Sequence, residues 1–301
     1  MKHKWEILWI SGVMLWGLFP IVTIFTYSYI SIIYSLAISS FFSILFFLVF
    51  FIKNKEWRYF KIKKWWSYLL WSSILNGIIF YLIMFYWLQY TDAINASILW
   101  LWEILFAYLF FWILFAAKKS TPNEIVWSIF MIIGTLVVLF PGKINIHYWD
   151  IFIILGTMVA PIWNDLARKT IHIFSTNFLM LIRSFLATIF LFIYWYFYSE
   201  LPPQENLIIV LPYLIFSWVF LFWLSKILFL GALKHISLPR LSSFIVLYPL
   251  STIIYSIILF MKYPTLAQSF GLFPMIIWVL IFFRRIDIEK LFRNKVNRWN
   301  T

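Results

Sequence analysis

The stretch ILWISGVMLWGLFPIVTIFTYSYISIIYSLAISSFFSILFFLVFFI, residues 7–52, contains no Asp, Glu, Lys or Arg. A transmembrane helix needs about 20 mostly apolar residues, so this stretch is long enough for two of them. The polar run Thr26-Tyr27-Ser28-Tyr29 near its middle offers a turn between the two. The stretch therefore predicts two membrane-spanning helices, over residues 7–26 and 30–52.

The rest of the chain divides in the same way, because charged or turn-forming residues separate further apolar segments of similar length. Hydrophobic residues make up 64% of the chain and charged residues only 12%, whereas a soluble domain has about 25% charged residues. Lipid can surround this much apolar surface and a soluble fold cannot bury it. We therefore expect an all-α integral membrane protein with ten transmembrane helices. The eight further predicted spans are residues 66–88, 94–116, 124–140, 149–167, 177–198, 207–230, 241–261 and 266–283.

The Lys and Arg residues test this map, because cytoplasmic loops of membrane proteins carry an excess of them. If the N-terminus is inside, all but four of the 24 Lys and Arg fall in segments predicted to face inward. Lys143 and Lys262 fall in outward loops, and Arg183 and Lys226 lie within spans. A missed helix would reverse the side of every later loop, so both termini are predicted to be cytoplasmic. The net charge of +13 is spread over these short loops, which argues against nucleic acid as a partner.

Ten spans with both ends inside divide into two five-helix halves, residues 1–146 and 147–301. A half with an odd number of spans inserts in the opposite orientation to its partner half. We therefore expect two inverted five-helix repeats around a central cavity, as in many secondary transporters. The expected location is the inner membrane of a bacterium.

Three motifs carry a resemblance to a known family: LWGLFP at residues 15–20, YTDAINASILWLWEILFAYLFF at 90–111 and APIWNDLARK at 160–169. They resemble the first-, fourth- and sixth-helix patterns of the drug/metabolite transporter superfamily, in its EamA-like branch. The resemblance implies ten helices in two inverted repeats and a central cavity. It also implies that the protein moves a metabolite by alternating access.

Charge inside the bilayer is the strongest indicator of a functional site, because a charged side chain at a helix centre costs about 2.5–3.5 kcal/mol on insertion scales. Glu103 lies roughly ten residues from either end of its predicted span, and therefore near the midplane. Burial disfavours the charged form of a carboxyl group, so this side chain can bind a cationic group or take up a proton during transport. The alternative is a structural ion pair with Arg183 or Lys226.

Arg183 and Lys226 both fall in the cytoplasmic half of the bilayer in this map. Arg183 can hold a carboxylate or phosphate if it lines the cavity. Alternatively, the long side chain of either residue can extend to the membrane interface. Together with Glu103, the two cations would suit a zwitterionic substrate such as an amino acid.

Six further residues at suitable positions complete the candidate substrate-binding set: Trp16, Asn76, Trp100, Trp163, Asn164 and Tyr248. A tryptophan such as Trp16 or Trp100 can stack on an aromatic or cationic group. With 19 tryptophans in the chain, packing or an interfacial position is the alternative for any one of them. Polar side chains in spans are often partners in hydrogen bonds between helices. For Asp165, next to this set, we expect pairing with Arg168 or Lys169 at the interface.

The sequence indicates no metal and no cofactor. The four histidines lie in loops or at helix ends without metal-ligand spacing, and no Gly-rich phosphate loop precedes a helix. A membrane-embedded lipid-modifying enzyme is an alternative that would need a nucleophile, a base or metal ligands gathered at the interface. A channel is another, and would need a filter-like loop. Neither pattern is visible in the sequence.

The expected partners are a small-molecule substrate and the lipid bilayer. The segment KNKEWRYFKIKKWW, residues 53–66, is both basic and aromatic. Such segments bind anionic lipid head groups at the cytoplasmic face. The chain is expected to act as a monomer or homodimer.

Overall fold

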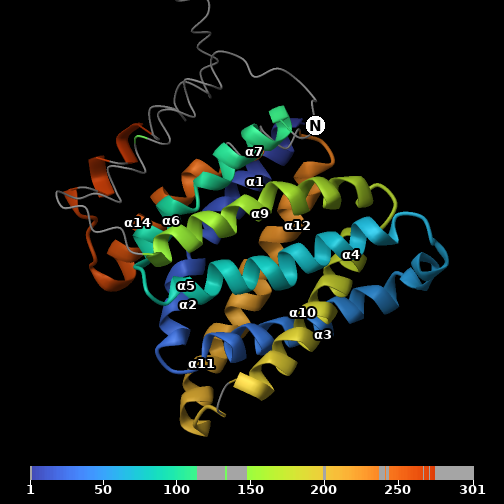
Figure 1. Ribbon diagram of the computed structural model, residues 1–301, viewed down its shortest axis with the longest axis horizontal. Coiled ribbons are helices and arrows are strands. Elements are labelled where there is room, and N and C mark those ends of the chain that lie inside the picture. Colours follow the sequence, from blue (N-terminus) through green and yellow to red (C-terminus); the bar gives the residue numbers. More distant parts are fainter. Residues whose placement is uncertain are drawn as a thin grey trace, which may run out of the picture.

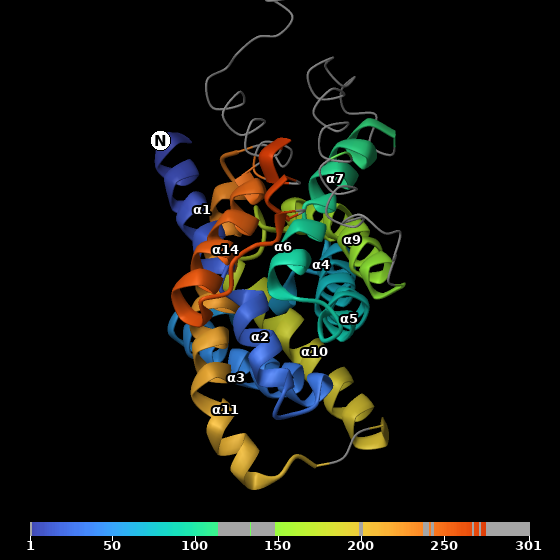
Figure 2. The same ribbon diagram turned by 90° about the vertical axis from the view of Figure 1, so that its left-hand side faces the viewer.

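The computed structural model describes residues 2–113, 133, 148–198, 201–236, 241, 244–266, 268–270 and 272–274. In this part of the chain all regular structure is helical, and the helices pack into one bundle (Figures 1 and 2). Five helical segments are long and apolar enough to cross a membrane, and each coincides with a predicted span. They are Lys4–Tyr27, Ile32–Lys53, Trp66–Leu88, Tyr148–Thr170 and Thr176–Tyr198.

The second and third predicted spans form unbroken helical segments. The second is α3 (Ile32–Lys53), which begins where the Ser31 hydroxyl accepts a hydrogen bond from the Tyr34 backbone N–H, at 3.4 Å. The third runs through α4 (Trp66–Ile74), the π-helix η2 (Leu75–Phe85) and α5 (Tyr86–Leu88) without a gap. A short 3₁₀-helix, η1 (Glu56–Lys61), lies between them.

The first predicted span is divided into α1 (Lys2–Trp16) and α2 (Phe19–Tyr27). The sequence explains this break, because Pro20 has no backbone N–H to donate to the Trp16 carbonyl. At the break, the Leu18 N–H bonds to the Leu15 carbonyl, three residues back, at 3.2 Å, rather than to the fourth residue back as in an α-helix.

The fourth predicted span is divided in the same way, into α6 (Ala93–Leu99) and α7 (Trp102–Ile113). Its turn at Trp100-Leu101 also uses bonds to the third residue back, from the Leu101 N–H to the Ile98 carbonyl and from the Glu103 N–H to the Trp100 carbonyl, both at 3.0 Å. The break therefore lies directly before the carboxyl group singled out from the sequence. At the start of α6, the Asp92 carboxylate accepts hydrogen bonds from the N–H groups of Ile94 and Asn95, both at 2.9 Å.

The second half contributes the sixth to ninth predicted spans. The sixth and seventh are α9 (Tyr148–Thr170) and α10 (Thr176–Tyr198). The eighth is the uninterrupted series α11 (Gln204–Phe216), π-helix η3 (Ser217–Leu224) and α12 (Ser225–Leu233). The ninth includes the 3₁₀-helix η4 (Phe244–Val246) and α14 (Leu247–Phe260). Apart from residue 133, the predicted span at 124–140 lies outside the described residues, as does much of that at 266–283.

The two predicted halves pack against each other along most of their helices. In Figure 1, α9 lies between α7 and the α4–α5 segment, and α3 runs beside α10. On the other side of the bundle, α1 contacts both α12 and α14, and α6 contacts α14. The centre of the bundle is therefore built from helices of both halves.

The break in the first span is pressed against α14. A Cβ atom on Gly17 would overlap the Ser251 hydroxyl and come within 3.0 Å of the Thr252 backbone nitrogen. The Thr252 hydroxyl donates a hydrogen bond to the Gly17 carbonyl at 3.0 Å. Gly17 is thus required by the close approach of two helices.

Candidate binding cavity

A cavity that is partly open to its surroundings lies between the two halves of the bundle. The first half lines it with α1, η2, the turn between α6 and α7, and the start of α7. The second half lines it with α9, α12, η4 and α14.

Seven of the nine candidate residues line this cavity: Trp16, Trp100, Glu103, Trp163, Asn164, Lys226 and Tyr248. Arg183 and Asn76 are buried elsewhere, with exposed fractions of 4% and 2%. Arg183 packs where α10 meets η2, and its Cγ lies 3.1 Å from the position of a Cβ built on Gly77. Arg183 is therefore buried inside the protein. A role in substrate binding remains a prediction for all nine residues.

Glu103 lies in the first turn of α7 because the span is broken at Trp100-Leu101. The N-terminal end of a helix favours a negative charge. The Trp100 indole N–H donates to Oε2 at 3.0 Å, and the Asn164 side-chain amide donates to Oε1 at 3.3 Å. A carboxylate can accept about four hydrogen bonds, so further acceptor positions remain for a ligand.

Lys226 points its ammonium group into a group of aromatic rings. Its Nζ lies 4.9 Å from the centre of the Trp16 ring, 5.2 Å from that of Trp163 and 5.8 Å from that of Phe229. We call these three rings the aromatic cage. Within the described residues, no ion pair of 4.0 Å or less joins Glu103 to Lys226 or Arg183. The expected alternative of a direct structural ion pair is therefore not observed.

Three polar atoms in the cavity wall are buried without a hydrogen-bond partner in the described part of the chain: the Trp163 indole nitrogen, Asn164 Oδ1 and the Tyr248 hydroxyl. Buried polar groups nearly always have a partner. These atoms offer one donor, one acceptor and one hydroxyl that can do either. They are the wall atoms best suited to hydrogen-bond a ligand.

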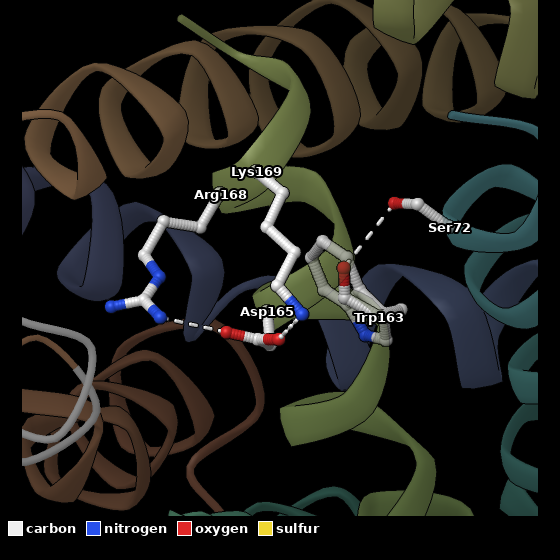
Figure 3. Close-up of polar contacts among 5 residues, drawn as sticks. All are labelled: Ser72, Trp163, Asp165, Arg168 and Lys169. Carbon is white, nitrogen blue, oxygen red and sulfur yellow. Dashed lines mark hydrogen bonds and ion pairs between the residues drawn. The ribbon is translucent and has the colours of Figure 1, made fainter. Parts of the chain in front are cut away.

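Asp165, on α9 close to the cavity, is engaged by neighbouring cations (Figure 3). Its carboxylate oxygens lie 2.8 Å from Arg168 Nη2 and 2.7 Å from Lys169 Nζ. The expected pairing is confirmed, with both cations rather than one. Figure 3 also shows the Ser72 hydroxyl donating to the Trp163 carbonyl at 3.2 Å, which ties α4 to α9 beside the cavity.

Sequence reasoning missed several residues of the wall, above all Phe229, which completes the aromatic cage. Its spacing of three from Lys226 is a usable signal, because residues three apart share a helix face. The same signal connects Trp9 and Val13 to Trp16 along α1. Phe80, from η2, also lines the cavity, but no charged residue at helical spacing from it indicated this position in the sequence.

The described residues form a helical bundle with five segments long and apolar enough to cross a membrane, as in a multi-pass membrane protein. The EamA-like transporter family model matches the chain twice, over residues 3–140 and 147–284. The chain therefore belongs to the EamA-like transporter family, and it is an integral membrane transporter of small solutes. The family resemblance found in the motifs is confirmed.

Among solved structures, one crystal structure of a protein matches 91% of this chain and 95% of its own chain. The two share 11% sequence identity with a TM-score of 0.64, which indicates a common fold and nothing about substrate. No curated protein sequence matches this chain.

Proposed function

We propose that this protein is a secondary transporter that moves a small zwitterionic metabolite, such as an amino acid, by alternating access. The main support is that the cavity wall carries the Glu103 carboxylate and the Lys226 ammonium without a direct ion pair between them. A zwitterion can bring its ammonium group to the carboxylate and its own carboxylate to the lysine. Burying a charge without an opposite charge nearby is costly, so such a ligand would bring each wall charge an opposite charge at ion-pair distance.

The remainder of the wall suits the same kind of ligand. The free polar atoms of Trp163, Asn164 and Tyr248 can hydrogen-bond its polar end. Aromatic and aliphatic side chains, among them Phe80 and Ile245, can surround an apolar side group. A mostly apolar wall with a few convergent polar groups is the usual composition of a small-molecule site.

We further propose that ten spans form two inverted repeats with both termini in the cytoplasm. The distribution of Lys and Arg and the two family matches, 3–140 and 147–284, support this arrangement. So do the breaks at Gly17-Leu18 and Trp100-Leu101, because discontinuous helices commonly form the binding sites of inverted-repeat transporters.

Glu103 is the group that we propose to couple transport to protons. Its side chain is 6% exposed, and both of its hydrogen-bond donors, from Trp100 and Asn164, are uncharged. A proton and a ligand ammonium group would compete for the same carboxylate. Proton uptake would therefore weaken binding of the ammonium end and promote release of the substrate.

The test is uptake by purified protein in liposomes, with a panel of zwitterions, organic anions and organic cations, with and without a pH gradient. We expect uptake of a zwitterion by the wild type. Glu103→Gln should abolish this uptake or its pH dependence. Asp165→Asn is the matched control, because it makes the same chemical change at a buried carboxylate that does not line the cavity.

Failure of the wild type to move any zwitterion in the panel would refute the proposed substrate class. Equal uptake by the wild type and by Glu103→Gln at every pH would refute the role of Glu103 in binding and in proton coupling.

A further inference from the structure

The aromatic cage around Lys226 has the chemistry of a binding site for an organic ammonium group. A cation within about 6 Å of an aromatic ring face is attracted by the ring electrons, and several such rings together are the known means of binding methylated ammonium ligands. Here three rings lie 4.9–5.8 Å from one nitrogen, which belongs to the protein itself. The rings come from three helices, α1, α9 and α12, so the tertiary fold assembles the cage.

Contacts that do not involve Lys226 hold the cage rings in place. Trp16 stacks on Phe19, with ring centres 4.5 Å apart and planes inclined by 4°. Trp163 packs against Phe229 with ring centres 6.0 Å apart, and its carbonyl is fixed by the hydrogen bond from Ser72. The cage should therefore keep its shape when the lysine ammonium is elsewhere.

Lys226 is well suited to leave the cage. Its ammonium group sits on a flexible four-carbon stem, and no carboxylate among the described residues holds it at ion-pair distance. Beyond ion-pair distance, the Lys226 ammonium is repelled by the charge of Arg183 and attracted by that of Glu103. Departure becomes favourable when a new anionic partner is offered.

We propose that the cage is the binding site for the ammonium group of a ligand, and that Lys226 occupies it while no ligand is bound. This inference rests on the proposed function, in which the cavity receives a zwitterion. The ligand ammonium enters the cage beside Glu103, and the displaced Lys226 ammonium pairs with the ligand carboxylate.

The exchange explains how the cavity would reject simple organic cations. Lys226 is attached next to the cage, so its effective concentration there is high and an untethered cation competes poorly. A simple amine that displaced the lysine would also leave a buried ammonium group without a partner. A zwitterion avoids this penalty because it carries the replacement partner with it.

The test is binding of choline, a quaternary ammonium without a carboxylate, to the full-length protein in detergent. Lys226→Met removes the ammonium and keeps an unbranched apolar side chain. We expect this variant to bind choline at least about tenfold more tightly than the wild type, measured by calorimetry and by thermal stabilisation. Dimethylbutanol, the uncharged carbon isostere of choline, should show no such gain.

Further variants on the Lys226→Met background identify the site. Trp163→Leu and Glu103→Gln should each weaken choline binding by about tenfold or more, because they remove a cage ring or the neighbouring carboxylate. Trp71→Leu is the matched control, since Trp71 is 57% exposed on α4 and outside the cavity. Lys226→Gln serves as the second variant if Lys226→Met does not fold.

Choline binding that is equally tight in the wild type and the folded Lys226 variant would overturn the proposal. So would no choline binding by that variant, or binding that Trp163→Leu leaves unchanged. Failure of zwitterion uptake by the wild type would instead refute the proposed function and leave the choline result intact, so the two failures are distinguishable.

Discussion

Replacement of Gly17 by Ala tests whether the break in the first span must press against α14. The new methyl carbon would overlap the Ser251 hydroxyl and lie 2.7 Å from the Ser251 Cβ and 3.0 Å from the Thr252 backbone nitrogen. Non-bonded carbon atoms normally stay about 3.5–4.0 Å apart, so one helix must move by roughly 1 Å. The backbone of Gly17 is outside the left-handed region, so the effect is steric and not conformational.

The expected change in the stability of Gly17→Ala is the sum of three contributions. Overpacking costs about 1–3 kcal/mol, and turning the Ser251 hydroxyl away breaks its 2.7 Å bond to the Tyr248 carbonyl, at a cost of about 0.5–1.5 kcal/mol. Replacing glycine by alanine also lowers the conformational entropy of the unfolded chain, which stabilises the folded protein by about 0.5–1 kcal/mol. The net loss of stability for Gly17→Ala is about 0.5–4 kcal/mol, with a central value of about 2 kcal/mol.

Gly12→Ala is the matched control on the same helix. Its added carbon would meet only side-chain atoms, of Trp9 and Leu228, at 3.2–3.4 Å. These can shift slightly, so we expect a change of less than about 1 kcal/mol. The assay is thermal unfolding in detergent, where Gly17→Ala should melt several degrees below Gly12→Ala, and Ser251→Gly in the same chain should restore part of the loss. Equal melting of the two alanine variants, or no restoration by Ser251→Gly, would show that the helix contact is not as tight as described.

Three more substitutions separate function from stability. Glu103→Gln should abolish zwitterion uptake or its pH dependence, and lower stability by only about 1–2 kcal/mol because the amide keeps one acceptor oxygen. Uptake equal to that of the wild type at every pH would contradict this prediction. Asp165→Asn should leave uptake unchanged and lower stability by about 1 kcal/mol, because its cationic partners are 41% and 39% exposed; lost uptake with normal folding would contradict this. Ser175→Ala should lower stability by about 1–2 kcal/mol in thermal melts. The Ser175 hydroxyl accepts a hydrogen bond from the Phe178 N–H at the start of α10 and donates one to Glu56 Oε1 at 2.6 Å, and alanine can make neither. An unchanged melting temperature would contradict this prediction.

The continuous spans could be predicted from sequence because their ends are set locally. Charged or turn residues flank α3, α9 and α10, and the observed ends lie within a few residues of the predicted ones. The break after Trp16 also had a local signal in Pro20. The break at Trp100-Leu101 had none, since neither glycine nor proline occurs there. The tertiary contact at this break, from Asn164 on α9 to Glu103, cannot be read from the local sequence.

The charged members of the candidate set could be found because a charge avoids lipid. That rule predicts that Glu103, Arg183 and Lys226 do not face the lipid. It does not predict which part of the protein interior each of them faces. Two of them reached the cavity, whereas Arg183 lies between α10 and η2. The aromatic wall was harder to predict, because with 19 Trp and 35 Phe in the chain the rotation of each helix decides which rings face inward.

The breaks in the spans also connect the cavity to helix movement. Trp16 ends α1, Trp100 lies between α6 and α7, and Tyr248 lies in the first turn of α14. Their rings touch in series, with centres 5.9 Å apart for Trp16 and Trp100 and 5.5 Å apart for Trp100 and Tyr248. A helix bends most easily where its hydrogen-bond ladder is already interrupted. Bending at either broken span would therefore move rings that surround the ligand site. A ligand that contacts these rings would bind one helix arrangement more tightly than another, and its binding would favour that arrangement.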